Sequence, residues 1–328
     1  MSEYNDSNRA FLQAFMARSS MTFEDAQPIL AAILTVSEEQ TVDPEDITED
    51  RFLDYVSAAN TAVSPFDLEI RSSLPQAPQP IQTDDTQPAP ARVYALVNTT
   101  SDALTQLATT YSPDEIAFVK RLLDYMFDTN NTRLFEGMAA SQMQAVGLHK
   151  APSSGRLSTS NDSTQTQTAA VQSLRMTQAE TLIIRLIEEG WLQKSRSGYL
   201  SLTPRALMEL RGWLVLTYND ENYDGRVMER IKFCAACQEI ITVGQRCGDH
   251  DCNGRLHNHC MRNFFRMQQA EKCPVCKEEW PGDMFVGEKA ITVNARSSNA
   301  VPQRSQISSA APSELREDSG DGNNATEG

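Results

Sequence analysis

The stretch that decides the fold runs from Cys234 to Cys276 and reads 234-CAACQEIITVGQRCGDHDCNGRLHNHCMRNFFRMQQAEKCPVC-276. Its spacing is C-x2-C-x9-C-x4-C-x4-H-x2-C-x12-C-x2-C, and all 7 cysteines of the chain lie within it. Thiolate sulfur and imidazole nitrogen are the ligands that zinc prefers, and a structural zinc ion takes four of them in a tetrahedron. Eight ligands therefore predict two zinc ions.

Spacing alone does not fix which ligands share an ion, but close-spaced pairs in so short a stretch suit two interleaved sites better than two consecutive ones. The first ion is assigned to Cys234, Cys237, His257 and Cys260, and the second to Cys247, Cys252, Cys273 and Cys276. Both sites are closed, so the zinc is expected to be structural. It would supply most of the folding energy of so small a module, about 10–16 kcal/mol per site.

Two alternatives concern these ligands. A disulfide framework is disfavoured because the number of cysteines is odd and the rest of the chain has none. His250 and His259 compete with His257 for the single imidazole position. His259 adjoins Cys260, and ligands on adjacent residues would strain one tetrahedron, so His257 is preferred and His250 is the next candidate.

The ligand order, closed by Cys273-Pro274-Val275-Cys276, resembles the RING family of cross-braced zinc modules, many of which are ubiquitin ligases. PHD fingers, which read histone tails, share the order but usually carry a tryptophan where this chain has Glu271. The RING resemblance implies an apolar groove for a ubiquitin-conjugating enzyme and a cationic residue after the last ligand. These positions correspond here to Ala236, Phe264, Pro274, Val275 and Lys277. For Phe264 and its neighbour Phe265, packing of a short helix under the second zinc is an alternative role.

Length and composition limit the possible classes. With 328 residues and 40% hydrophobic content, the chain has room for two or three small domains. No apolar run approaches the length of a membrane-spanning helix, so no membrane is expected as a partner. A formal charge of -15 argues against a broad DNA-binding face, and DNA contact is expected to be weak or made through partners.

Residues 1–110 predict a winged-helix domain. Apolar residues recur at helical spacing and then alternate as in strands, and prolines interrupt the pattern in a wing loop at 74–91. The expected elements are helices around 11–16, 29–34 and 52–59 and strands around 66–70 and 93–97.

Residues 111–217 predict a second winged-helix domain. Ser112-Pro113-Asp114-Glu115 is a strong helix start, and a β-hairpin is expected at 191–202. The stretch 151–176 is rich in Ser, Thr and Gln and is interpreted as a disordered insertion. A linker at 218–230, the RING-like zinc domain at 231–282 and a disordered tail at 295–328 would follow. The predicted class is therefore α+β: two tandem winged-helix domains and a small cross-braced C4HC3 module with two zinc ions.

This domain order, with the strings Tyr94-Ala95-Leu96-Val97-Asn98 and Glu189-Gly190-Trp191-Leu192, resembles the non-SMC element 1 family of the SMC 5/6 complex. The resemblance implies a nuclear, chromatin-associated subunit that acts in DNA repair by homologous recombination. It also implies a RING-type ubiquitin ligase that binds a ubiquitin-conjugating enzyme, is stimulated by a MAGE-like winged-helix subunit, and assembles with a kleisin subunit. Such a ligase works by proximity and needs no catalytic residue of its own. The competing hypothesis is a non-enzymatic scaffold whose zinc module stabilises the winged-helix subcomplex.

Overall fold

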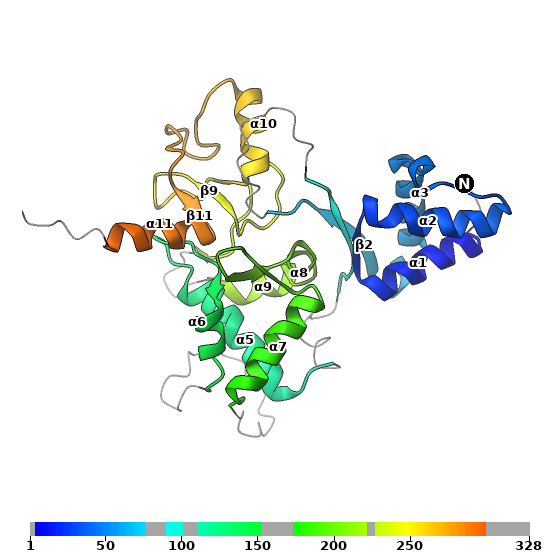
Figure 1. Cartoon of the computed structure of the whole chain (residues 1–328). Coiled ribbons are helices and arrows are strands. Elements are labelled where there is room, and N and C mark those ends of the chain that lie inside the picture. The colour runs from blue at the N-terminus through cyan, green and yellow to red at the C-terminus, as the bar shows by residue number, and fades with distance from the viewer. Residues whose placement is uncertain (1–3, 77–89, 101–109, 152–172, 222–226, 300–328) are drawn as a thin grey trace, which may run out of the picture.

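The computed structural model describes residues 4–76, 90–100, 110–151, 173–221 and 227–299. Figure 1 shows three parts: a helical unit drawn in blue, a second unit in green, and a yellow and orange module that lies against the green unit. Most of the expected wing loop 74–91, the insertion 151–176 and the tail 295–328 falls outside the described residues.

The first unit has the winged-helix order of elements. They are α1 (Asp6–Arg18), β1 (Ser20–Thr22), α2 (Phe23–Glu38), α3 (Glu49–Val63), β2 (Leu68–Ser73) and β3 (Val93–Asn98). The strands form an antiparallel sheet in the order β1-β3-β2. Side-chain caps begin the helices: the Asn5 side chain accepts from the Asn8 amide, and Thr22 and Asp25 form a reciprocal capping box.

The core of this unit is aromatic. Phe11, Phe15 and Phe52 are fully buried, and Tyr94 of β3 packs edge-to-face on Phe52 with the ring centroids 4.8 Å apart. Rings in this arrangement contribute about 0.5–1.5 kcal/mol beyond the area they bury. The pair ties the helices to the sheet.

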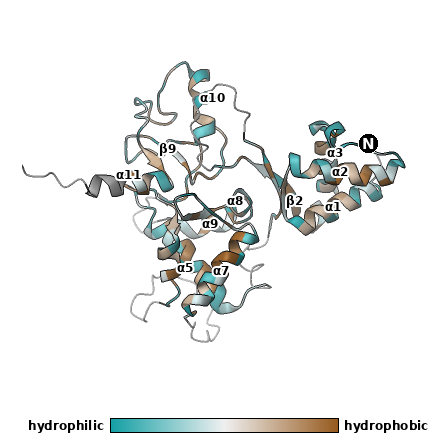
Figure 2. Ribbon diagram, in the orientation of Figure 1, coloured by the Kyte–Doolittle hydropathy of each residue, from teal (hydrophilic) through white to brown (hydrophobic). Residues whose placement is uncertain are grey.

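The second unit repeats the same order. Its elements are α5 (Pro113–Asp124), a π-helical turn (Tyr125–Thr129), β4 (Ala140–Ser141), α6 (Gln142–Gly147), α7 (Met176–Glu188), β5 (Leu192–Lys194) and β6 (Tyr199–Leu202). Its sheet order, β4-β6-β5, matches that of the first unit. The predicted cap is present. The Ser112 side chain accepts a hydrogen bond from the Glu115 backbone amide, and the Glu115 carboxylate accepts one from the Ser112 backbone amide. Figure 2 shows hydrophobic residues concentrated in α5 and α7, the helices that form the core with the hairpin.

Two further helices, α8 (Pro204–Glu209) and α9 (Arg211–Tyr218), cover the second unit and join it to the first. Met208 of α8 is buried against Ala95 and Val97 of β3. The two winged-helix units therefore touch through an apolar contact between α8 and the first sheet.

The zinc module follows a hairpin of β7 (Asn219–Glu221) and β8 (Val227–Glu229), which lies where a linker was expected at 218–230. The module contains β9 (Gly244–Arg246), β10 (Arg255–Leu256), α10 (Asn258–Gln268), β11 (Phe285–Val286) and α11 (Glu288–Asn299). Its sheet order is β10-β9-β11, so the sheet extends past residue 282. α11 also occupies the first residues of the expected tail.

The predicted α+β class is confirmed: two units of winged-helix topology precede a small module that gathers the cysteines and His257. Within the described part of the chain, no helix is both long and apolar enough to span a bilayer.

Candidate metal centre

Two tight turns present four of the eight candidate ligands. In the first, Gln238 donates its amide to the Cys234 carbonyl at 2.9 Å, and Phe233 pairs with Ile240 as an antiparallel bridge. The turn at Cys273 to Cys276 repeats this geometry, with the Lys277 amide 3.1 Å from the Cys273 carbonyl. Gln238 and Lys277 both adopt left-handed backbone conformations, with φ of 61° and 67°. Each turn aims its two sulfurs at one point.

The first cluster contains Cys234, Cys237, His257 and Cys260, whose ligand atoms all lie within 4.8 Å of one another. His257 precedes α10 and directs Nδ1 at the sulfurs, 3.2 Å from Cys237 Sγ and 4.0 Å from Cys260 Sγ. Its other nitrogen, Nε2, lies 3.3 Å from the Ile240 carbonyl. A proton on Nε2 donates to that carbonyl and leaves the Nδ1 lone pair free for a metal.

The second cluster contains Cys247, Cys252, Cys273 and Cys276, again within 4.8 Å. Cys247 and Cys276 have their sulfurs 3.5 Å apart, and Cys252 and Cys273 have theirs 3.6 Å apart. A tetrahedron with zinc–sulfur bonds of about 2.3 Å has edges of about 3.8 Å, whereas a disulfide is about 2.05 Å long. Both clusters therefore fit a zinc ion, and all seven cysteines are free of disulfides.

Glycine is required beside the second cluster. A Cβ placed on Gly254 would collide with the sulfur of Cys273, which cannot move without disturbing the tetrahedron. The Gly254 amide also donates to Cys252 Sγ at 3.3 Å, which stabilises the thiolate form that binds metal.

The two competing histidines lie outside both clusters. His250 Nδ1 contacts the guanidinium of Arg246 at 3.2 Å. His259 stacks on the His257 ring with the centroids 5.0 Å apart and so packs beside the ligand that the geometry favours. Bound zinc would serve as a structural cross-link at both sites, because four protein ligands leave no open position.

The candidate groove residues lie around the two turns and on α10. Ala236 and Lys277 are exposed, and Val275 has 56% of its surface exposed. Pro274 and Phe264 are half-buried, and Phe264 packs with Phe265 against the cysteine core. Phe264 therefore packs α10 against the module, as one alternative expected, and still keeps part of its surface exposed for a groove contact. Lys277 donates to the Pro274 carbonyl at 2.8 Å within its own turn.

A buried ion cluster, not anticipated from the sequence, fastens the module to the second winged-helix unit. Glu136, from the loop before β4, is 2% exposed and accepts two hydrogen bonds from Arg255 of β10, at 2.6 and 2.8 Å. Lys232 and Arg246 approach the same carboxylate at 2.6 and 3.2 Å. Burial alone would raise the pKa of Glu136, but the Arg255 hydrogen bonds and the three cations outweigh it and lower the pKa to about 2. Glu136 is therefore ionised throughout the neutral range.

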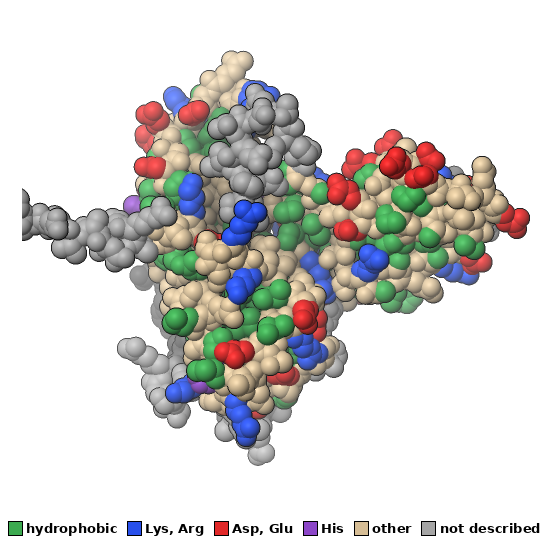
Figure 3. All heavy atoms as spheres, in the orientation of Figure 1, with side chains coloured by type: hydrophobic (Ala, Val, Ile, Leu, Met, Phe, Trp, Pro, Cys, Tyr) green, Lys and Arg blue, Asp and Glu red, His purple; other side chains and the backbone are tan. Residues whose placement is uncertain are grey.

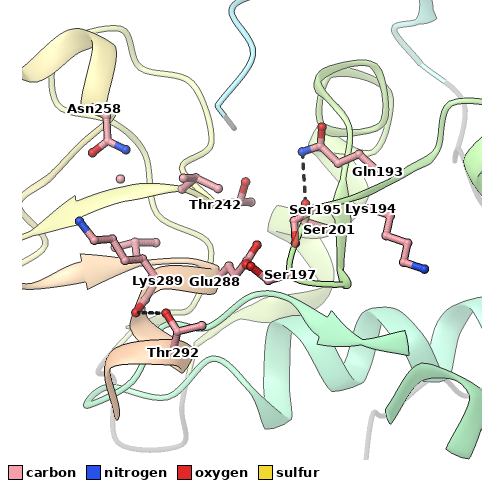
Figure 4. Close-up of a pocket in the computed structure, with 13 residues that line it drawn as sticks. Gln193, Lys194, Ser195, Ser197, Ser201, Thr242, Asn258, Glu288, Lys289 and Thr292 are labelled. Carbon is pink, nitrogen blue, oxygen red and sulfur yellow. Dashed lines mark hydrogen bonds between the residues drawn. The ribbon is translucent and has the colours of Figure 1, made fainter. Parts of the chain in front are cut away.

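A cavity of about 310 Å³ lies where the hairpin of the second unit meets the module and α11. In Figure 4, Lys289 extends toward Asn258 across this cavity, and Lys194 turns away from it. Thr242, Ser195 and other polar residues line the cavity together with the apolar residues Val243 and Val286. Next to this cavity the unit and the module share an apolar core, because Ile231, Ile240 and Val286 are buried in the same cluster as the hydrophobic residues of the second unit. The module is therefore held by this core as well as by the ion cluster at Glu136.

Fold and site together define a tandem winged-helix protein with a RING-like module built around two zinc-type clusters. The chain matches the family model described as Nse1 non-SMC component of SMC5-6 complex over residues 8–210, and a RING-like domain model over 234–276. The chain therefore belongs to the Nse1 family, as its sequence indicated.

Individual relatives agree with this assignment. The human non-structural maintenance of chromosomes element 1 homolog is 22% identical over 309 residues, which cover 93% of this chain and 97% of the relative. The Saccharomyces cerevisiae element 1 is 26% identical over 176 residues, covering 50% of this chain and 48% of that protein. A solved structure named Nse1-Nse3-Nse4 complex has the same fold, with a TM-score of 0.59 and 21% identity over 86% of this chain and 99% of that one.

Proposed function

We propose that this Nse1-family chain is a RING-type E3 ubiquitin ligase that binds a charged ubiquitin-conjugating enzyme at the groove between its two zinc turns. The observation that carries the proposal is the position of Ala236 and Val275, each exposed in the middle of a turn whose flanking cysteines fix its shape. Apolar side chains displayed on a rigid loop lose little conformational entropy on binding. Catalysis would come from holding the thioester near its acceptor, so this chain needs no nucleophile.

The surface around α10 supports the same role. Met267 lies one turn after Phe264 and is 85% exposed, so the two residues share a face of the helix. Lys277 provides a cation beside the last ligand, where the RING resemblance places the residue that bridges enzyme and ubiquitin. Lysine makes one point contact where an arginine could make two, and a modest activity that depends on a partner is the expected result.

The proposed partners follow from the family and from the solved relative. That solved structure is named as a complex of Nse1 with Nse3 and Nse4. The likeness supports assembly of this chain with a MAGE-like subunit and a kleisin subunit. We infer that the MAGE-like subunit stimulates the ligase, and that the complex acts in the nucleus in DNA repair by homologous recombination.

Direct DNA contact is expected to be weak. The last residue of α2 and the segment between α2 and α3 expose five acidic side chains: Glu38, Glu39, Asp43, Glu45 and Asp46. Figure 3 shows acidic side chains gathered on the first unit. Such a surface repels phosphate, so DNA would be reached through partners.

A ubiquitin-discharge assay with the zinc-loaded chain and its Nse3 counterpart tests the proposal. Ala236→Asp, Val275→Asp and Lys277→Ala leave all eight ligands in place and are expected to reduce discharge to the rate of the conjugating enzyme alone. Val36→Asp changes an equally apolar and 81% exposed residue on α2 and should leave the rate unchanged. Wild-type activity equal to the enzyme-alone rate would refute the ligase.

The buried contacts of the module favour a second candidate function, that of a scaffold. Glu136 and its three cations make the module part of the body of the protein and not a mobile appendage. If the groove variants assemble normally and wild type shows no ligase activity, while removal of zinc dissociates the complex, the scaffold is the function.

A further inference from the structure

Gln76 links the first winged-helix unit to the zinc module. It follows β2 near the start of the wing and is 7% exposed, although it belongs to a loop. Its amide nitrogen donates to the Ile240 carbonyl at 2.6 Å. Its amide oxygen accepts from the Thr242 and Val243 amides, at 2.8 and 3.2 Å, and from the Thr242 hydroxyl at 3.1 Å. The side chain thus pairs with the module's backbone much as a neighbouring strand would.

One of these bonds reaches a metal-site residue. The Ile240 carbonyl that accepts from Gln76 is the same carbonyl that lies 3.3 Å from Nε2 of His257. When Nδ1 binds a metal, the proton of His257 lies on Nε2 and can donate to this carbonyl, which then orients the ring so that Nδ1 faces the three sulfurs. A partner that orients a histidine ligand in this way typically accounts for about 10- to 100-fold in metal affinity.

We propose that Gln76 is a positioning residue for the first zinc site: it fixes the Ile240 carbonyl and, through it, the ligand nitrogen of His257. The site is then complete only when the first winged-helix unit is seated on the module. Figure 1 shows β2 and β3 extending from the first unit toward the module, which is the direction this contact requires. This role of Gln76 does not depend on ligase activity.

The second zinc site has a matching support from the other unit. Arg255 Nη1 donates to the carbonyls of Cys252 and Gly254 at 2.7 and 2.8 Å, and Glu136 holds the opposite edge of the same guanidinium. The loop that carries Cys252 is therefore braced through Glu136 of the second unit. The two supports should act separately, each on its own metal site.

Gln76→Glu in the full chain tests the first support. Glutamate keeps the acceptor for Thr242 and Val243 but, when ionised, has no proton to donate to Ile240. Gln76→Met, which has similar length and no hydrogen-bonding group, serves as a second variant in case a carboxylate at this position impairs folding. The matched control is Gln27→Glu, because Gln27 donates to the Ile47 carbonyl at 3.2 Å entirely within the first unit.

The first measurement is cadmium NMR of protein loaded with cadmium in place of zinc, because a site with three sulfurs and one nitrogen and a site with four sulfurs give separate resonances. Gln76→Glu and Gln76→Met should shift the resonance of the histidine-containing site and leave that of the all-cysteine site in place. Arg255→Lys keeps the charge but loses the two-pronged donation. It should shift the resonance of the all-cysteine site and leave that of the histidine-containing site in place.

The second measurement is release of the two ions to a chelator. Either Gln76 variant should weaken the affinity of the histidine-containing site for its ion by about tenfold or more. The affinity of the all-cysteine site should stay as in wild type. Spectra identical to wild type, equal effects on both sites, or the same effect from Gln27→Glu would overturn the proposal.

Discussion

Glu136 and Arg255 form a two-pronged ion pair, at 2.6 and 2.8 Å, between a loop of the second winged-helix unit and a strand of the zinc module. Both side chains are almost fully buried, with 2% and 0% of their surface exposed. Because Lys232 and Arg246 face the same carboxylate, three cations share one anion. Loss of that anion should leave uncompensated positive charge in the interior.

Glu136→Gln is therefore expected to destabilise the protein by roughly 3–5 kcal/mol, the range for removing one member of a buried charge pair. Chemical denaturation of the zinc-loaded chain would measure this. The control is Glu69→Gln: Glu69 pairs with Arg71 at 2.9 Å, but the side chains are 44% and 39% exposed, so the loss should stay below about 1 kcal/mol. Equal effects of the two substitutions would show that the buried pair contributes no more than the surface one.

Removal of zinc should unfold the module selectively. The module's own core consists mainly of its cysteines with Leu256 and Trp280, whereas each winged-helix unit has an apolar core of its own. Ligand sites of this kind supply folding energy outright, so a chelator should expose residues 231–282 to protease. Limited proteolysis followed by mass spectrometry would locate the cuts, and added zinc should restore protection. Cleavage spread evenly over the whole chain would contradict this expectation.

Much of this architecture could be predicted from the sequence because its signals are local. The helix at 113–124 begins with a complete capping box at Ser112 and Glu115. The close-spaced ligand pairs in so short a stretch favoured the two interleaved groups that the structure brings together. Strands β1 and β4 escaped detection because, at three and two residues, they are too short to show an alternating pattern.

The supports of the two clusters were not predictable in this way. Glu136 and Gln76 are single polar residues whose partners lie more than a hundred positions later in the chain, at Arg255 and Thr242. No periodicity or motif marks such a residue, since only the tertiary fold determines that it is buried. Strand β11 was missed for the same reason: it forms an edge of the module's sheet only through its pairing with β9.

Lys277→Arg is expected to raise the rate of ubiquitin discharge a few-fold. The residue is exposed at the end of the second turn, and a guanidinium can bond two acceptors where the ammonium bonds one. Single-turnover discharge to free lysine would measure the change. Lys272→Arg, at another exposed lysine beside the same turn, is the matched control and should have no effect. A rate that Lys277→Arg leaves unchanged would remove Lys277 from the proposed mechanism.

Met208→Ala should loosen the two winged-helix units from each other. Met208 is 6% exposed and fills the space over Ala95 and Val97, two small side chains that cannot move to close a cavity. Truncating a buried methionine costs about 2–5 kcal/mol, and here the cost falls on the contact between units and not on the core of either. Because these contacts join the units, we expect the wild type to unfold in one calorimetric transition and Met208→Ala to unfold in separate transitions. Met143→Ala, at a residue 86% exposed on α6, should leave the trace unchanged. A single, equally cooperative transition in Met208→Ala would mean that Gln76 and the zinc module suffice to hold the first unit in place.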